Sequence, residues 1–154
     1  MSKHGSIWWS ELMAEDAPAV AKFYAKVIGW QPFHASMGDM KKPAKAGEPS
    51  YTLFMQDGQP MCGAMTMSQA GMPAVPPRWF TYIAVDDVDK ACKVATVAGG
   101  KVVKPAFDVP GVGRMAFIQD PEGAVVGLGT PAAAAKPAAA KKPKVAAKVG
   151  AKKK

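Results

Sequence analysis

Roughly the first 130 residues of the chain contain one sequence pattern twice. The stretch IWWSELMAEDAPAVAKFYAKVIG at 7–29 is similar to RWFTYIAVDDVDKACKVATVAGG at 78–100. A shift of 71 positions aligns aromatic, acidic and glycine residues: Trp8 with Trp79, Trp9 with Phe80, Glu11 with Tyr82, Asp16 with Asp87, Gly29 with Gly100. A repeat this long indicates two copies of one supersecondary unit that share a core. A cleft between such copies is a natural place for a ligand.

Each copy is expected to have the order β-α-β-β-β. In the first copy, 6–13 alternates aromatic and polar residues as a strand does, Asp16 is a suitable helix N-cap, and Gly29 ends the helix. The remaining elements expected there are strands at 30–37, 51–56 and 61–67, with a polar loop at 37–49. The second copy is expected to contain a strand at 79–85, a helix at 87–98, strands at 101–105, 114–119 and 124–129, and a loop at 107–113.

The net charge of +8 belongs to one end of the chain. Residues 132–154 contain eight lysines and no acid, and the rest of the chain carries twelve bases and twelve acids. We therefore divide the chain into a neutral body at 1–131 and a Lys/Ala/Pro-rich tail at 132–154. The body is divided into modules at about 6–67 and 78–130, joined by a linker at 68–77. The tail has too little apolar surface to form a core, so we expect it to be disordered.

The composition favours a cytoplasmic protein. Cys62 and Cys92 stand apart without a CxxC motif, as expected for reduced thiols. The N-terminus MSKHGSIWW is too short and polar for a signal peptide, and we expect no association with a membrane.

The motifs FYAKVIGW, VDDVDKA and DPEG, together with the duplicated β-α-β-β-β order, resemble the vicinal oxygen chelate superfamily. This group includes glyoxalase I, bleomycin-resistance proteins and extradiol dioxygenases. The resemblance covers about residues 6–130. It implies an α+β fold in which two βαβββ modules form an incomplete barrel around a U-shaped cavity. It also implies a homodimer.

The resemblance further implies where a divalent metal ion would be held. In metal-dependent members, His or Gln comes from the first strand of each module and Glu from the last strand. The matching positions here are Trp9, Phe80, Gly63 and Gly127. These residues offer no ligand for a divalent ion, so we expect neither a metal nor another cofactor.

The same alignment predicts the lining of the cavity. Trp9, Glu11 and Met13 should share one strand face, as should Phe80 and Tyr82. Gly63 and Gly127 are expected to leave space there. Further wall residues are expected to be Phe54, Met65 and Met115. Such a pocket suits a planar or apolar small molecule.

Glu11 is the candidate catalytic residue. Burial against Trp9 and Phe80 would raise the pKa of its carboxyl, which suits a general acid or base. Tyr82 could donate a hydrogen bond to a substrate oxygen or to Glu11. The alternative is a purely structural Glu11–Tyr82 hydrogen bond that closes the interior between the modules.

Three functions remain open on the sequence. The first is binding of a small molecule without a metal, and the second is a metal-independent lyase or isomerase reaction with Glu11 as the base. The third is a nucleoid-associated protein whose tail binds DNA without reading sequence, because lysine contacts phosphate and the tail has no aromatic residue for base stacking. The tail residues expected to contact nucleic acid are Lys141, Lys142, Lys144, Lys148, Lys152, Lys153 and Lys154.

Overall fold

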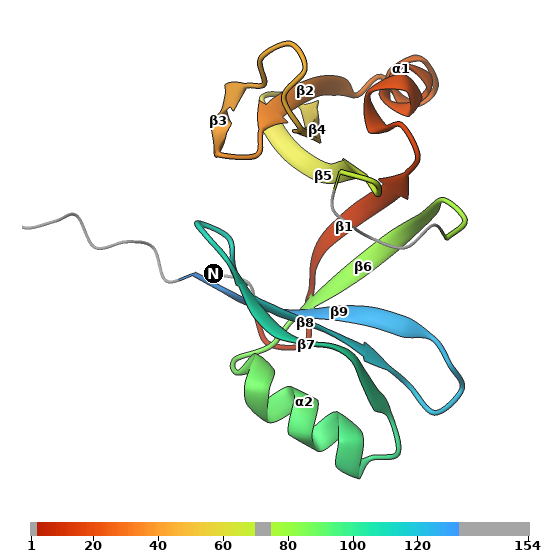
Figure 1. The fold of residues 1–154 in the computed structure, drawn as a ribbon, viewed down its shortest axis with the longest axis vertical. Helices are drawn as coiled ribbons and strands as arrows, with labels where there is room; N and C mark the ends of the chain where they lie inside the picture. The colour runs from red at the N-terminus through yellow and green to blue at the C-terminus, as the bar shows by residue number, and fades with distance from the viewer. Residues whose placement is uncertain (1–2, 70–74, 133–154) are drawn as a thin grey trace, which may run out of the picture.

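The described part of the chain forms one mixed β-sheet of nine strands, with one helix packed on each half (Figure 1). This computed structural model describes residues 3–69 and 75–132. The elements are β1 (Ile7–Ala14), α1 (Ala17–Ile28), β2 (Gln31–Ser36), β3 (Asp39–Pro43), β4 (Ser50–Gln56), β5 (Gln59–Thr66), β6 (Arg78–Ala84), α2 (Val88–Val97), β7 (Lys101–Val109), β8 (Gly113–Gln119) and β9 (Val125–Pro131).

The sheet topology shows the repeat directly. The strand order is β3-β2-β4-β5-β1-β6-β9-β8-β7. The first strand of each half runs parallel to the last strand of the same half, β1 to β5 and β6 to β9. The two first strands pair with each other antiparallel at the centre. The open sheet and the two helices confirm the α+β class and the two-module architecture that the sequence predicted.

Two segments predicted as loops contain strand. Residues 39–43 of the expected loop at 37–49 form β3, which pairs with β2 at the edge of the sheet. A polar edge strand has one neighbour and no buried face, so it shows no apolar alternation. Likewise, β7 continues to Val109, because register shifts around Lys104 allow the strand to pass Pro105 and pair Phe107 with Met115.

The helices begin where the sequence predicted. The carboxylate of Asp16 accepts a hydrogen bond from the Ala19 amide at 2.9 Å, and Asp87 caps α2 in the same way. Gly29 ends α1 with φ of 86°, a conformation that glycine adopts without steric cost. Neither helix in the part of the chain that the structure describes has the length and apolar character needed to cross a bilayer.

The helices cover the outer side of the sheet. Beneath α1, the side chains of Leu12, Ala14, Phe54 and Ala64 pack against the helix. Phe54 was predicted to line the cavity, and this prediction is wrong because its ring is fully buried in this outer core. The opposite side of the sheet, which we call the inner face, is left for the candidate site.

Candidate ligand-binding site

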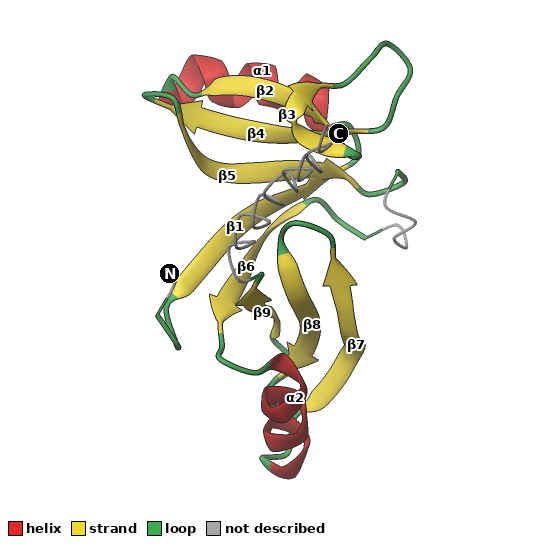
Figure 2. Cartoon of the chain, turned by 90° about the vertical axis from the view of Figure 1, so that its left-hand side faces the viewer, coloured by secondary structure: helices red, strands yellow, loops and turns green. Residues whose placement is uncertain are grey.

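The inner face carries a cluster of aromatic and methionine side chains. Figures 1 and 2 show α1 and α2 at opposite ends of the molecule, each outside its half of the sheet, so the two inner faces are turned toward each other. The buried members of this inner cluster are Met13, Met67, Phe80, Tyr82 and Met115. Partly exposed members around them are Trp8, Trp9, Val75, Phe107, Val109 and Phe117. The cluster combines side chains from both halves.

Glu11 lies within this cluster and takes part in a chain of hydrogen bonds. Its side chain is only 5% exposed. The Tyr82 hydroxyl donates to Oε2 of Glu11 at 2.9 Å, and Tyr51 is a second hydrogen-bond partner of the carboxyl. The indole Nε1 of Trp9 in turn donates to the Tyr51 hydroxyl oxygen at 2.9 Å. The hydrogen bond between the two aligned repeat residues, Glu11 and Tyr82, is therefore present.

Burial governs the protonation of this group. It raises the pKa of Glu11 above its ordinary value, and the hydrogen bonds from Tyr51 and Tyr82 oppose that rise in part. Burial also raises the pKa of both tyrosines, and the nearby negative charge of Glu11 raises it further. The two phenols thus keep their protons and act as donors.

Gly63 and Gly127 do not leave the space that the sequence predicted. A Cβ atom at Gly63 would overlap the hydroxyl end of Tyr51, and one at Gly127 would overlap the ring of Tyr82. Each tyrosine therefore lies directly against the bare backbone of a glycine. The two glycines are required for the position of the hydrogen-bonded tyrosines.

A β-bulge adds a second indole to the inner face. The pairing of β1 with β6 shifts register between Ile7 and Trp9, so one extra residue enters β1. As a result, the Trp8 ring packs in the inner cluster and covers the backbone of Gly129. Trp79, the repeat counterpart of Trp8, instead contacts Tyr24 of α1 on the outer side of the sheet.

The residues at the four family metal positions do not fit a divalent ion. Trp9 and Phe80 supply carbon rings and an indole N–H, and the tyrosines occupy the places of side chains at Gly63 and Gly127. The described residues contain no group of three or more His, Cys, Asp or Glu side chains that could hold a metal elsewhere.

The remaining predicted site residues divide into three sets. Met115 is buried in the inner cluster, and Met65 pairs with Met13 and Tyr51, so it belongs to the same face. Phe54 belongs to the outer core. All the tail lysines predicted to contact nucleic acid lie outside the described residues.

Sequence reasoning missed Tyr51 and the inward position of Trp8. Strand alternation could have found Tyr51, because in β4 it lies on the opposite face from Phe54, three residues away. The same alternation places Phe54 on the outer side of β4, which excludes it from the predicted lining of the cavity. The bulge at Trp8 has no such signal.

The structure also changes the expected shape of the site. The hollows on its surface include one beside residues 36–48 and one between α1 and β6. The centre of the inner face is instead filled by Glu11, Tyr51 and Tyr82. The partly exposed rings of Trp9, Phe107 and Phe117 are the surfaces that a molecule could contact there.

Comparison with known families gives one match across most of the body. The model of the glyoxalase/bleomycin resistance protein/dioxygenase superfamily matches residues 7–128. CFP32 of Mycobacterium tuberculosis, provisionally named a glyoxylase, is 37% identical over 126 residues, which are 82% of this chain and 46% of that protein. The anthracycline biosynthesis protein DnrV of Streptomyces peucetius is 34% identical over 78% of this chain and 45% of its own length. The chain thus spans about half the length of these relatives.

Solved structures agree on the fold. A methylmalonyl-CoA epimerase of Streptomyces coelicolor superposes with a TM-score of 0.57 at 16% identity, and the match covers 85% of this chain and 100% of that one. At this identity the likeness concerns the fold alone.

We predict that Glu11→Gln changes the pH dependence of stability. The folded chain holds the Glu11 proton more tightly than the unfolded chain, because burial raises its pKa above 4.5. The wild-type protein should therefore lose stability as the pH rises from about 4.5 through the folded-state pKa. The amide cannot ionise, so the unfolding free energy of the variant relative to wild type should rise over that window and then level off. Urea denaturation at a series of pH values measures this difference.

Tyr82→Phe provides the contrast for this experiment. It removes a hydrogen bond that lowers the pKa of Glu11, so the pH-dependent loss should extend to higher pH. If the difference in unfolding free energy between Glu11→Gln and wild type stays constant with pH, the raised pKa of Glu11 is contradicted.

We predict that Gly127→Ala destabilises the fold by about 1–3 kcal/mol, because the added methyl group overlaps the buried Tyr82 ring. Gly38→Ala is the matched control, since its nearest neighbour would be the Ser36 hydroxyl at 3.8 Å, an ordinary contact. We expect that variant to stay within about 0.5 kcal/mol of wild type. Chemical denaturation compares the two, and equal stability would show that Tyr82 does not need the bare glycine.

Proposed function

This chain belongs to the glyoxalase/bleomycin resistance protein/dioxygenase superfamily, and on that premise we propose that it binds a small, planar and largely apolar molecule at the inner face without a metal ion. The observation that carries the proposal is the inner cluster itself, which surrounds the Glu11–Tyr51–Tyr82 group with aromatic and methionine side chains. Such surfaces suit flat apolar ligands.

The geometry of the rings supports a flat ligand. Phe117 meets Phe80 edge-on with centroids 5.1 Å apart and meets Phe107 in the same way at 5.9 Å. The ammonium of Lys104 lies 4.1 Å from the centroid of the Phe107 ring. A planar molecule can pack against the exposed parts of Phe107, Phe117 and Trp9, with Lys104 beside it. The relative DnrV is named for the biosynthesis of anthracyclines, which are planar polycyclic compounds, and this agrees with the proposed ligand class.

Glu11 has a positioning role in this proposal. Its carboxyl accepts a hydrogen bond from Tyr82 of β6 and interacts with the hydroxyl of Tyr51 of β4, and these two strands lie on either side of β5 and β1. The group thus fixes the two halves of the inner face relative to each other. A ligand would then meet a surface that is already ordered, so less conformational entropy is lost on binding.

A second candidate function rests on the raised pKa of Glu11. A carboxylate with a raised pKa can remove a proton from a carbon next to a carbonyl group. The C–H electron pair would form an enolate, whose oxygen would accept a hydrogen bond from Tyr82, and return of the proton would complete an isomerisation. This reaction requires a substrate to reach a side chain that is 5% exposed, so it ranks below simple binding.

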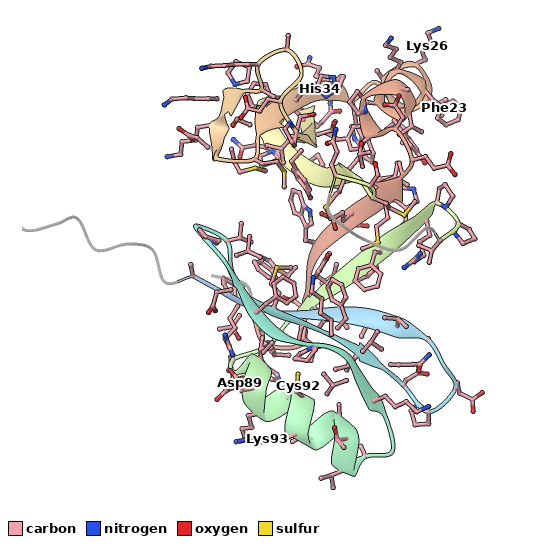
Figure 3. All side chains as sticks on the ribbon, viewed as in Figure 1. Phe23, Lys26, His34, Asp89, Cys92 and Lys93 are labelled. Atoms are coloured by element: carbon pink, nitrogen blue, oxygen red, sulfur yellow. The ribbon has the colours of Figure 1, made fainter. Side chains whose placement is uncertain are left out.

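The binding proposal predicts that Phe117→Ala weakens binding of an anthracycline by about tenfold or more, because it removes a ring contact worth about 1.4 kcal/mol or more. Phe23→Ala is the matched control, since Phe23 lies on the exposed side of α1 (Figure 3). Titration followed by the fluorescence of the anthracycline gives both dissociation constants. Equal affinities, in variants that circular dichroism shows to be folded, would place the ligand elsewhere.

The catalytic alternative predicts faster exchange of the carbon-bound protons of hydroxyacetone for deuterium in D₂O in the presence of the protein. Glu11→Gln should abolish this acceleration, because the amide cannot accept the proton. Proton NMR follows the exchange, and a rate equal to that of buffer alone would remove the catalytic role.

A further inference from the structure

A groove of about 440 Å³ lies on the outer side of the sheet, between α1 and the start of β6. It is separate from the inner face, and its size is within the range of small-molecule sites. Leu12, Ala14 and Val20 supply apolar surface, and Trp79 forms a wall. The groove therefore offers an aromatic and aliphatic lining that the proposed function does not use.

The Trp79 wall is held in a fixed position. Its indole Nε1 donates to the Tyr24 hydroxyl at 3.1 Å, and its ring contacts those of Tyr24, Trp30 and Phe54 at centroid distances of 5.5, 6.3 and 6.4 Å. The side chain is nevertheless 39% exposed, so part of the ring is free to stack on a ligand. The Tyr24 hydroxyl accepts from Trp79 and still has its own proton to donate.

Charged side chains of both signs line the same groove. Glu15 and Asp16 stand where β1 leads into α1, and Arg78 stands at the start of β6. One oxygen of Asp16 caps the helix, which leaves the other for a ligand. The Arg78 guanidinium donates one long hydrogen bond, of 3.4 Å, to the Pro76 carbonyl oxygen. A molecule that carries one positive and one negative charge would meet a partner for each.

The second half of the repeat does not reproduce this groove. The counterpart of Arg78 is Ile7, and that of Tyr24 is Ala95. The counterpart of Trp79 is Trp8, which the β-bulge turns to the inner face. The exposed Trp79 ring, the Tyr24 hydroxyl and the combination of acidic residues with Arg78 are thus specific to this groove, and the duplicated fold does not by itself produce them.

We propose that this groove binds a free aromatic amino acid. The aromatic ring stacks on Trp79 and the ammonium group lies toward Glu15 and Asp16. The carboxylate pairs with Arg78 and can accept from the Tyr24 hydroxyl. This site is independent of the ligand at the inner face, so either proposal can fail without the other.

Calorimetry with three related probes tests the assignment of charges. The full chain should bind L-tryptophan about tenfold more tightly than tryptamine, which lacks the carboxylate, or indole-3-propionate, which lacks the ammonium group. Glu15→Gln should weaken L-tryptophan and tryptamine but leave indole-3-propionate unchanged. Arg78→Met should weaken L-tryptophan and indole-3-propionate but leave tryptamine unchanged.

A pair of helix variants tests the location. Ala19 is exposed and lines the groove, so Ala19→Phe should fill it and abolish binding of L-tryptophan. Lys26→Phe is the matched control, because Lys26 lies on the same helix and points away from the sheet (Figure 3). Full binding by Ala19→Phe, equal affinity for all three probes, or no heat of binding with millimolar L-tryptophan would each overturn the proposal. If Ala19→Phe does not fold, the Glu15→Gln and Arg78→Met variants still test the proposal.

Discussion

The antiparallel pairing of β1 with β6 is the contact on which the rest of the structure depends. Each half alone would leave the first strand of its sheet as an open edge, which is prone to pair with other chains. The pairing joins these edges, with Trp9 opposite Tyr82 and Glu11 opposite Phe80. It therefore builds the continuous sheet and, in the same step, brings Glu11 and Tyr82 from the two repeats within hydrogen-bonding distance.

The duplicated halves meet at a set of rings, glycines and hydrogen-bonded polar groups. The family positions that hold a metal elsewhere are here occupied by rings and glycines, and the glycines admit Tyr51 and Tyr82. A buried carboxyl bonded to two phenols has thus taken the central place. Such a group orders the interior, because buried polar atoms must find partners and those of Glu11 and Tyr82 find each other.

Local signals in the sequence predicted much of this fold. The repeat predicted two modules, and Asp16, Asp87 and Gly29 marked helix ends because capping depends on one residue and its immediate neighbours. The alignment of Glu11 with Tyr82 also predicted the hydrogen bond between them. These features need little knowledge of the tertiary structure.

Features that depend on contacts between distant strands could not be predicted in the same way. The polar strand β3 exists because β2 offers it a free edge, and the inward turn of Trp8 depends on the register of β1 against β6. The filling of the space at Gly127 depends on a ring from a neighbouring strand. The wrong prediction for Phe54 has a different cause. It ignored the alternation of side chains between the two faces of β4, which places Phe54 in the outer core.

The bulge at Trp8 divides the four indoles of the protein into two pairs. Trp8 and Trp9 belong to the inner cluster, and Trp30 and Trp79 contact each other beside α1. The sheet stands between the pairs. A molecule bound at the inner face would therefore quench the fluorescence of the first pair, and replacing Trp30 and Trp79 with phenylalanine would leave an emission that reports on that face alone.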